Sequence, residues 1–280
     1  MHIFERLLPG NAPNNTTTYF NFAIAKAHTF FTCWLGGNDV LGYAATGGAG
    51  DTLTSKSYFN STYTQVISQL TANKQKGVVA TVPEVTSIPF FTTLTTDSIS
   101  KIIKAVNPGF AGLYITASST ANVGASYTTR LATGSDLFNL SFDISMIGKP
   151  TVTTSGIMPY GLSPAAPIEH KYVLDQNEVL IVKDYILAYN ASIKAIAKAK
   201  GLAVFDVYTY LNSLKGQAIT RDGVKLSGTY ITGGMFSLDA VHLTPRGYAA
   251  LANEFLKTIN EYYRTNLQPV NISGYAAVLP

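Results

Sequence analysis

Residues 28–39 read HTFFTCWLGGND, and this stretch decides the fold class. Its first eight residues form a short run rich in aromatic side chains, closed by Gly36 and Gly37, which is the pattern of a β-strand that ends at a turn. Residues 78–82, VVATV, and residues 202–207, LAVFDV, are further apolar runs of strand length. The sequence therefore predicts three strands that are buried in a sheet.

Helical patterns alternate with these strands. Apolar residues recur at helical spacing before the second strand: Tyr63, Val66, Ile67 and Leu70. We expect Gly77 to end that helix at its C′ position. Residues 95–106 show the same periodicity and predict another helix.

Two later helices carry end signals. Asp175 and Glu178 form a capping box that opens a helix to Lys200, and Gly201 closes it. The last helix begins at Thr244 as N-cap with Pro245 behind it. Its expected apolar face is Tyr248, Leu251, Ala252, Phe255, Ile259 and Tyr262. Strands that alternate with helices in this order predict an α/β fold with a doubly wound, mostly parallel sheet.

Residues 108–170 are less regular and rich in Gly, Ser, Thr and Pro. We interpret residues 1–280 as one domain that carries this stretch as an insertion. Long irregular segments in compact domains often serve function, so a lid is one interpretation. Extra strands with no role in chemistry are the other, and the sequence leaves both open.

Composition narrows the classes of protein. The net charge is +4, but Lys194, Lys198 and Lys200 occupy a helix and form no basic stripe with interleaved aromatics, so we expect no nucleic-acid partner. Cys33 is the only cysteine, which excludes an internal disulfide, and its apolar surroundings predict a buried, inert thiol. The first residues lack a signal-peptide pattern, and no apolar run approaches the ~18 residues of a membrane span.

Gly36-Gly37-Asn38-Asp39 lies at the carboxyl end of the first predicted strand, where ligands of open α/β sheets bind. Glycines permit a sharp turn there. The amide of Asn38 could donate a hydrogen bond to a developing oxyanion. An ordinary Asn-Asp turn after a strand is the alternative.

Asp239 precedes His242 by three residues in a loop just before the last helix. That spacing can bring the carboxylate to the imidazole, where it fixes the ring tautomer and stabilises the imidazolium. His242 could then act as a general base near neutral pH. A surface loop with an incidental histidine is the alternative.

The other histidines are weaker candidates. We expect His2 to lie near a frayed terminus and His28 to be a partly buried structural residue. His170 could face the crevice, but the simpler interpretation is that it does not. No pair of histidines has metal-ligand spacing, and no phosphate-binding glycine loop follows a strand. We therefore expect no metal and no cofactor.

The two motifs together resemble those of the SGNH hydrolases, also called GDSL lipases or esterases. The similarity extends to three longer stretches and covers most of residues 20–280. Their sequences are TFFTCWLGGNDVLGYA at 29–44, VVATVPEVTSIPFF at 78–91 and GGMFSLDAVHLTPRGYAALANEFL at 233–256. The sequences of these stretches are similar to those of exported GDSL-like hydrolases of Bacteroidetes-type bacteria.

The resemblance implies a flavodoxin-like, three-layer α/β/α fold. It implies an oxyanion-hole role for Asn38 and an acid–base role for Asp239 and His242. The family's nucleophile is the serine of a Gly-Asp-Ser block that precedes these motifs, and residues 1–37 contain none. Gly50-Asp51-Thr52-Leu53 mimics it after Asn38, but it follows no strand and has Thr for Ser, so we reject it.

We therefore expect the first strand or strands of the fold, the serine and a lipoprotein signal to lie in a missing N-terminal segment. The chain by itself is then expected to be inactive, and to self-associate or require that segment. The expected parent is a periplasmic or outer-membrane lipoprotein that hydrolyses a carboxylic ester, such as a lipid or an acylated sugar. The alternative is a catalytically inactive SGNH-like domain that binds a glycan or lipid.

Overall fold

The computed structural model describes residues 18–278. Within that range the chain is a mixed α/β protein with eight α-helices and several small sheets. The three predicted strands form one parallel sheet in the order β1-β2-β10, comprising Phe30–Cys33, Lys76–Ala80 and Ala203–Phe205. The α/β class is thus as the sequence predicted, with one parallel sheet of three strands, whereas the other sheets of the described residues are antiparallel.

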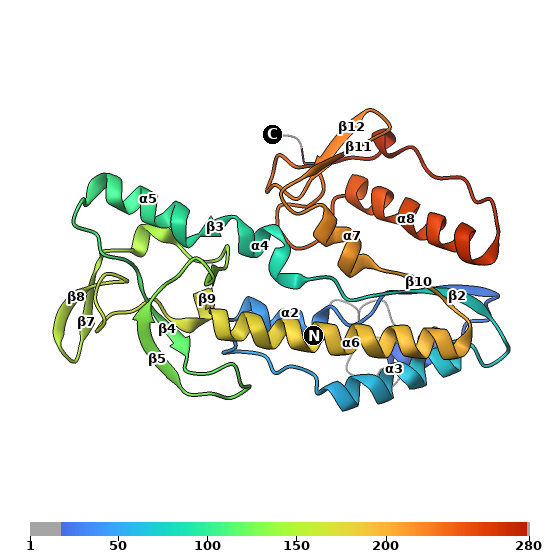
Figure 1. Ribbon diagram of the computed structural model, residues 1–280, viewed down its shortest axis with the longest axis horizontal. Coiled ribbons are helices and arrows are strands. Elements are labelled where there is room, and N and C mark those ends of the chain that lie inside the picture. Colours follow the sequence, from blue (N-terminus) through green and yellow to red (C-terminus); the bar gives the residue numbers. More distant parts are fainter. Residues whose placement is uncertain (1–17, 279–280) are drawn as a thin grey trace.

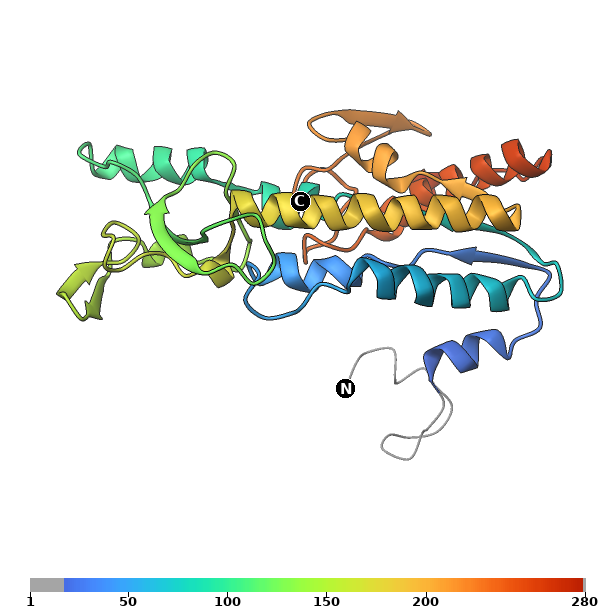
Figure 2. The ribbon, with the colours of Figure 1, turned by 60° about the horizontal axis from the view of Figure 1, so that its bottom comes forward.

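Helices cover both faces of this sheet (Figure 1). Helix α3, Lys56–Leu70, and helix α6, Gln176–Lys200, pack side by side on one face. Helix α8, Pro245–Tyr263, packs on the other face against β10 and β2. Figure 2 shows α2, Asn38–Ala45, continuing along α6 beyond the start of α3. The principal hydrophobic core lies between these layers.

The predicted helix ends are largely confirmed. The Asp175 carboxylate accepts hydrogen bonds from the amides of Asn177 and Glu178, and the Glu178 carboxylate accepts one from the amide of Asp175. Gly201 adopts a left-handed φ of 64° at the end of α6. Thr244 caps α8 by accepting a hydrogen bond from the Gly247 amide at 2.9 Å. Local capping chemistry therefore fixes where both long helices begin.

One expectation about the helices was wrong, and another was only partly right. Helix α3 ends at Leu70, and Gly77 lies inside β2. A Cβ at Gly77 would lie 2.6 Å from the ring of Phe31, so close packing between strands, and not a helix end, requires glycine there. On α8, Leu251 and Ile259 are buried as predicted, but Tyr248 and Tyr262 are about half exposed. Ala252 is exposed as well, and the buried face contains Ala249 and Ala250 instead. Small side chains let that helix approach the neighbouring elements closely.

The stretch predicted to be irregular forms strands with a core of its own. Two hairpins lie in it: β4, Tyr114–Ser118, with β5, Tyr127–Leu131, and β7, Pro150–Thr153, with β8, Gly156–Pro159. A small antiparallel sheet joins β3, Leu94–Thr95, to β6, Leu137–Phe138, and β9, Val173–Leu174. This lobe lies at the end of the molecule away from α8 (Figure 1).

The core of that lobe is a separate cluster of buried side chains: Ile99, Phe110, Leu113, Ile115, Ala117, Phe138, Phe142, Tyr160, Ile168 and Val173. Ile99 belongs to α5, Thr96–Val106, the helix predicted at 95–106. That helix therefore packs on the lobe and not on the parallel sheet.

Further short elements complete the described chain: α1 Tyr19–Ile24, η2 Val85–Ser87, α4 Pro89–Thr92, η3 Ile144–Met146, η4 His170–Tyr172, α7 Val207–Ser213 and η5 Ile272–Gly274. A hairpin of β11, Ala218–Arg221, and β12, Val224–Ser227, precedes the Asp239 loop. Its turn is Asp222-Gly223, both at positive φ, a strong hairpin signal that the sequence analysis did not use.

The remaining structural expectations concern single side chains. Cys33 is buried, and burial raises the pKa of its thiol to about 11. Lys194, Lys198 and Lys200 are exposed on α6. Among the described helices, none combines the length and apolar character that a membrane crossing requires.

Candidate functional site

Asp239 and His242 lie in a tight loop between β12 and α8. The loop is closed by an antiparallel bridge between Phe236 and Leu243 and by a hydrogen bond from the Ser237 amide to the His242 carbonyl at 2.8 Å. Between the acid and the histidine, Ala240 adopts a left-handed φ of 62°. This conformation is unfavourable for a residue with a Cβ. The backbone at Ala240 is therefore strained, and the strain accompanies the tight turn of the loop.

The carboxylate of Asp239 contacts the ring of His242 directly. Asp239 Oδ2 lies 2.7 Å from His242 Nδ1. Asp239 Oδ1 accepts three further hydrogen bonds, from Ser237 Oγ at 2.6 Å and from the amides of Val241 and His242, each at 2.9 Å. Four donors thus fix both oxygens, so the carboxylate can orient the imidazole without moving itself.

These contacts also set the charge of Asp239. Partial burial opposes ionisation, but the hydrogen bond from Ser237, together with those from Val241 and His242, outweighs it and holds the pKa well below the usual range. Asp239 is therefore ionised near neutral pH. A carboxylate at Nδ1 favours the tautomer that places its proton there and leaves Nε2 free to accept one.

The outer edge of the His242 ring faces solvent. Its side chain is 69% exposed, and among residues 18–278 no group forms a hydrogen bond with Nε2. Ser237 is the serine nearest in sequence, but its hydroxyl donates to Asp239. Within residues 18–278, no serine therefore forms the hydrogen bond to Nε2 through which His242 would activate a nucleophile.

Asn38 is the first residue of α2, directly after the carboxyl end of β1 and its turn. Gly37 is the N-cap residue, and the Asn38 side chain is exposed with no hydrogen-bond partner in the described part of the chain. Gly36 has φ 109°, and a Cβ there would lie 2.7 Å from Val82 Cγ2. Of the two glycines only Gly36 is required by the turn, since Gly37 has an ordinary helical φ of −60° and open space around it.

The two motifs flank one segment of the chain, Val85–Thr92. Helix α2 contacts η2, and the Phe90 amide of α4 donates to the Ala240 carbonyl at 3.1 Å. The segment follows β2 and therefore belongs to the carboxyl side of the sheet, where α/β proteins bind ligands. The fold thus brings helix α2, which begins at Asn38, and the Asp239 loop against a common segment.

Two features of this region were missed by the sequence analysis. Glu84, which follows β2, is buried and accepts hydrogen bonds from Thr86 Oγ1 at 2.9 Å and Tyr208 Oη at 3.2 Å. An acidic residue next to Pro83 at a strand end was the available signal. Ile231, in the loop that leads to the Asp239 motif, has φ 62°, which is rare for a β-branched residue and has no signal in the sequence.

The other histidines and the Gly50-Asp51 motif lie outside the Asp239 loop. His28 is partly buried and its ring contacts the carbonyls of Lys26 and Leu70, which is a structural role. The ring of His170 packs against that of Tyr127 at a tilt of 57°, with centroids 4.3 Å apart, and burial lowers the pKa of His170. His2 lies outside the described residues. Asp51 lies in the loop after α2, packed against Gly42, and follows no strand.

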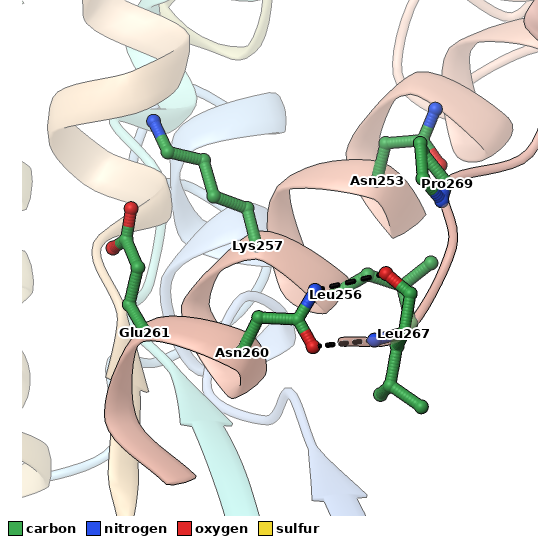
Figure 3. A pocket seen from close by; sticks show the side chains of 7 residues that line it. All are labelled: Asn253, Leu256, Lys257, Asn260, Glu261, Leu267 and Pro269. Carbon is green, nitrogen blue, oxygen red and sulfur yellow. Dashed lines mark hydrogen bonds between the residues drawn. The ribbon is translucent and has the colours of Figure 1, made fainter. Parts of the chain in front are cut away.

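A hollow on the surface lies elsewhere, between α8 and the returning C-terminal tail. It is lined by Asn253, Leu256, Lys257, Asn260, Glu261, Leu267 and Pro269 (Figure 3). Asn260 uses both ends of its amide on Leu267, so this polar group already has its partners. Within the described range, no three side chains of His, Cys, Asp or Glu gather as metal ligands would.

Comparison with known proteins adds no relatives: no family model, no curated protein and no solved structure matches the chain. The functional interpretation therefore depends on the motifs and on the geometry described above.

Proposed function

We propose that this chain contributes the acid–base half of a carboxylic-ester hydrolase of the SGNH type. The observation that carries the proposal is the contact of 2.7 Å between Asp239 Oδ2 and His242 Nδ1, with the far side of the imidazole open. In this mechanism a serine hydroxyl attacks the ester carbonyl and His242 Nε2 removes its proton. Asp239 holds the ring and stabilises the imidazolium.

Asn38 supplies a donor for the tetrahedral oxyanion. The backbone N–H of Asn38 is a second donor beside its free side-chain amide. This N–H lies at the start of α2, where the helix dipole favours negative charge. The acyl group then passes to the serine, the alcohol leaves with the proton from His242, and water releases the acid by the reverse sequence. The chemistry uses no cofactor.

The serine comes from a segment outside the described residues, within a flavodoxin-like sheet of which β1, β2 and β10 are one half. In this proposal the parent protein is exported as a periplasmic or outer-membrane lipoprotein. Its substrate is a small ester, either a lipid or an acylated sugar.

One observation favours a second candidate. No described hydroxyl bonds to His242 Nε2, and a domain without a nucleophile could retain the crevice and bind a glycan or lipid without cleaving it. The two candidates differ in whether the reading frame upstream of Met1 encodes a Gly-Asp-Ser block.

Hydrolysis of p-nitrophenyl acetate tests the proposal. The chain extended through its upstream reading frame is compared with the same chain carrying His242→Ala or Asp239→Asn. Each substitution should reduce kcat by about a thousandfold or more, because a triad acts as a unit. His170→Ala, in the other lobe, is the matched control and should retain activity. Equal rates for the extended chain and its His242→Ala variant would end the esterase proposal.

A further inference from the structure

The hairpin of β7 and β8 has one face that is wholly apolar and exposed. Strand pairing places Pro150 opposite Pro159 and Val152 opposite Ile157. Because alternate residues of a strand, and residues directly opposite one another, share a face of the sheet, these four side chains lie on the same side. Val152 is 84% exposed and Ile157 is 71% exposed. Two large aliphatic side chains therefore lie next to each other in solvent.

The segment around this hairpin carries no negative charge. Between Ile144 and Ile168 the only charged residue is Lys149, which is exposed and directly precedes β7. The turn that joins the strands is Thr154-Ser155, which is polar and uncharged. The hairpin thus combines an apolar face near its tip with one positive charge at its base.

Helix α5 shows the same combination at the same end of the molecule. Both ribbon views place α5 and the hairpin at the end away from α8 (Figure 1, Figure 2). Ile102 is 57% exposed and Val106 is 83% exposed, and their spacing of four residues places them on one side of the helix. Lys101 and Lys104 are exposed on the same helix. This end of the protein therefore has two apolar projections, each with lysines beside it.

The charge balance of this end is positive. Between Ser98 and Ile168 the acidic residues are Asp136 and Asp143. Asp136 is buried and forms an ion pair of 2.7 Å with Arg130, so these two charges cancel. The other charges of the stretch are the three lysines against Asp143 alone. A positive excess around apolar side chains is complementary to an anionic surface.

A protein partner fits this surface poorly. A stable protein interface buries about 800 Å² on each partner, and a hairpin with four residues in each strand offers much less. Pro150 and Pro159 lack the N–H groups that edge-to-edge pairing with a second copy would use. A lipid surface requires neither a matching groove nor a free strand edge.

The dimensions of the hairpin fit a lipid interface. Elements that bind at membrane surfaces bury their apolar side chains by about 5–10 Å, at the boundary between headgroups and acyl chains. A strand rises about 3.3 Å per residue, so Val152 lies about 10 Å beyond Lys149 along the hairpin. When Val152 reaches the acyl boundary, Lys149 is therefore at the level of the lipid phosphates.

We propose that this protein docks on an anionic lipid bilayer through the tip of the β7–β8 hairpin and the exposed side of α5. Val152 and Ile157 enter the boundary of the acyl chains, while Lys101, Lys104 and Lys149 contact lipid phosphates. This binding is peripheral, and it does not rest on the proposed function, because it requires neither a nucleophile nor an ester substrate.

Sedimentation with vesicles tests the proposal on the 280-residue chain. Vesicles of phosphatidylcholine that contain phosphatidylglycerol are compared with vesicles of phosphatidylcholine alone. The chain should sediment with the anionic vesicles, bind the neutral ones more weakly, and lose affinity for the anionic ones as salt rises. Lys149→Ala should lower the partition coefficient on anionic vesicles by about fivefold, because one lysine near the surface is lost.

A double substitution tests the apolar face. Val152→Thr with Ile157→Thr keeps both side chains β-branched, as strands favour, and removes apolar surface, so anionic-vesicle binding should weaken by about tenfold or more. Val123→Thr is the matched control, since Val123 is 54% exposed in the turn between β4 and β5. That turn lies toward α6, where Tyr127 Oη donates to Glu178, and binding should be unchanged.

A fluorescent probe gives a second measurement that does not depend on the threonine variants. Trp34 is the only tryptophan in the sequence, so Trp34→Phe provides a background without tryptophan. In that background, the emission of the Val152→Trp protein should shift to shorter wavelength when anionic vesicles are added. The emission of the Val123→Trp protein should stay where it is.

Three results would overturn the inference: no sedimentation of the parent chain with anionic vesicles, equal binding by the parent and the double threonine variant, or an unshifted emission of the Val152→Trp protein. If the double variant instead abolishes self-association in ultracentrifugation and leaves vesicle binding unchanged, the face is an interface between copies of the chain. None of these measurements uses enzymatic activity, so failure of the esterase proposal and failure of lipid docking are distinguishable.

Discussion

Glu178 is a carboxyl group buried where the lobe meets α2 and α6, and its charge should make the stability of the protein depend on pH. It is 1% exposed, and it accepts hydrogen bonds from the Asp175 amide and from Tyr127 Oη at 3.2 Å. Burial, followed by the negative charge of Asp175, raises its pKa to about 8. In the unfolded chain the same group titrates near about 4.3.

The sign follows from the number of protons bound. Between these two pKa values the folded state holds a proton that the unfolded state has lost. The free energy of unfolding should therefore fall by at most about 1.4 kcal/mol per pH unit as pH rises. Over the whole window the upper limit is about 5 kcal/mol, and relaxation around the site should reduce the observed loss to about 3 kcal/mol. The contribution is complete at acidic pH and lost above about pH 8.

Glu178→Gln removes the titration and keeps the shape. Glutamine also serves in a capping box, and the Tyr127 hydroxyl can accept from an amide as well as donate. Urea unfolding of both proteins from pH 5 to pH 9 gives the difference in stability. That difference should shift in favour of the variant by about 3 kcal/mol across the range.

The matched control is Glu261→Gln, a change of an exposed glutamate on α8. Its difference from the parent chain should stay level over the same pH range. A difference between Glu178→Gln and the parent that also stays level within about 0.5 kcal/mol would refute a buried, protonated Glu178.

Three further substitutions test local features. Gly36→Ala should destabilise the chain by about 2–4 kcal/mol, because φ is 109° and the new Cβ would contact Val82. Gly37→Ala should be neutral or slightly stabilising. Equal effects of the two substitutions on thermal unfolding would contradict a special requirement for glycine at position 36. Ile231→Gly should stabilise by about 1 kcal/mol by releasing a left-handed φ of 62°, and a lower melting temperature would argue against that strain. Thr244→Ala should lower the free energy of unfolding by about 1–2 kcal/mol, because it removes the cap of α8; an unchanged urea midpoint would show that the cap contributes nothing.

The sequence alone located the elements whose signals are local. Strand patterns of apolar residues predicted β1, β2 and β10, and the capping box at Asp175 and the Thr244-Pro245 pair predicted where α6 and α8 begin. The three-residue spacing of Asp239 and His242 predicted their contact, because a loop of that length can fold back within itself. Each of these depends on neighbours within a few positions of the chain.

Other features depend on partners distant in sequence, and these only the tertiary structure decided. The sequence around Gly77 predicted a helix end there. The position instead requires glycine because the ring of Phe31 on the adjacent strand fills the space that a side chain would occupy. The stretch predicted to be irregular forms strands because its apolar residues bury against one another in a second core. The raised pKa of Glu178 likewise comes from burial between segments far apart in the chain.

The candidate site divides in the same way. The motifs at Asn38 and Asp239 could be identified as short patterns. That helix α2 and the Asp239 loop both contact the segment Val85–Thr92 is a property of how the sheet and helices pack. Spacing along the chain fixes which groups can meet within a loop. Which loops meet is decided by long-range burial of apolar surface, since that term depends on the whole arrangement of the layers.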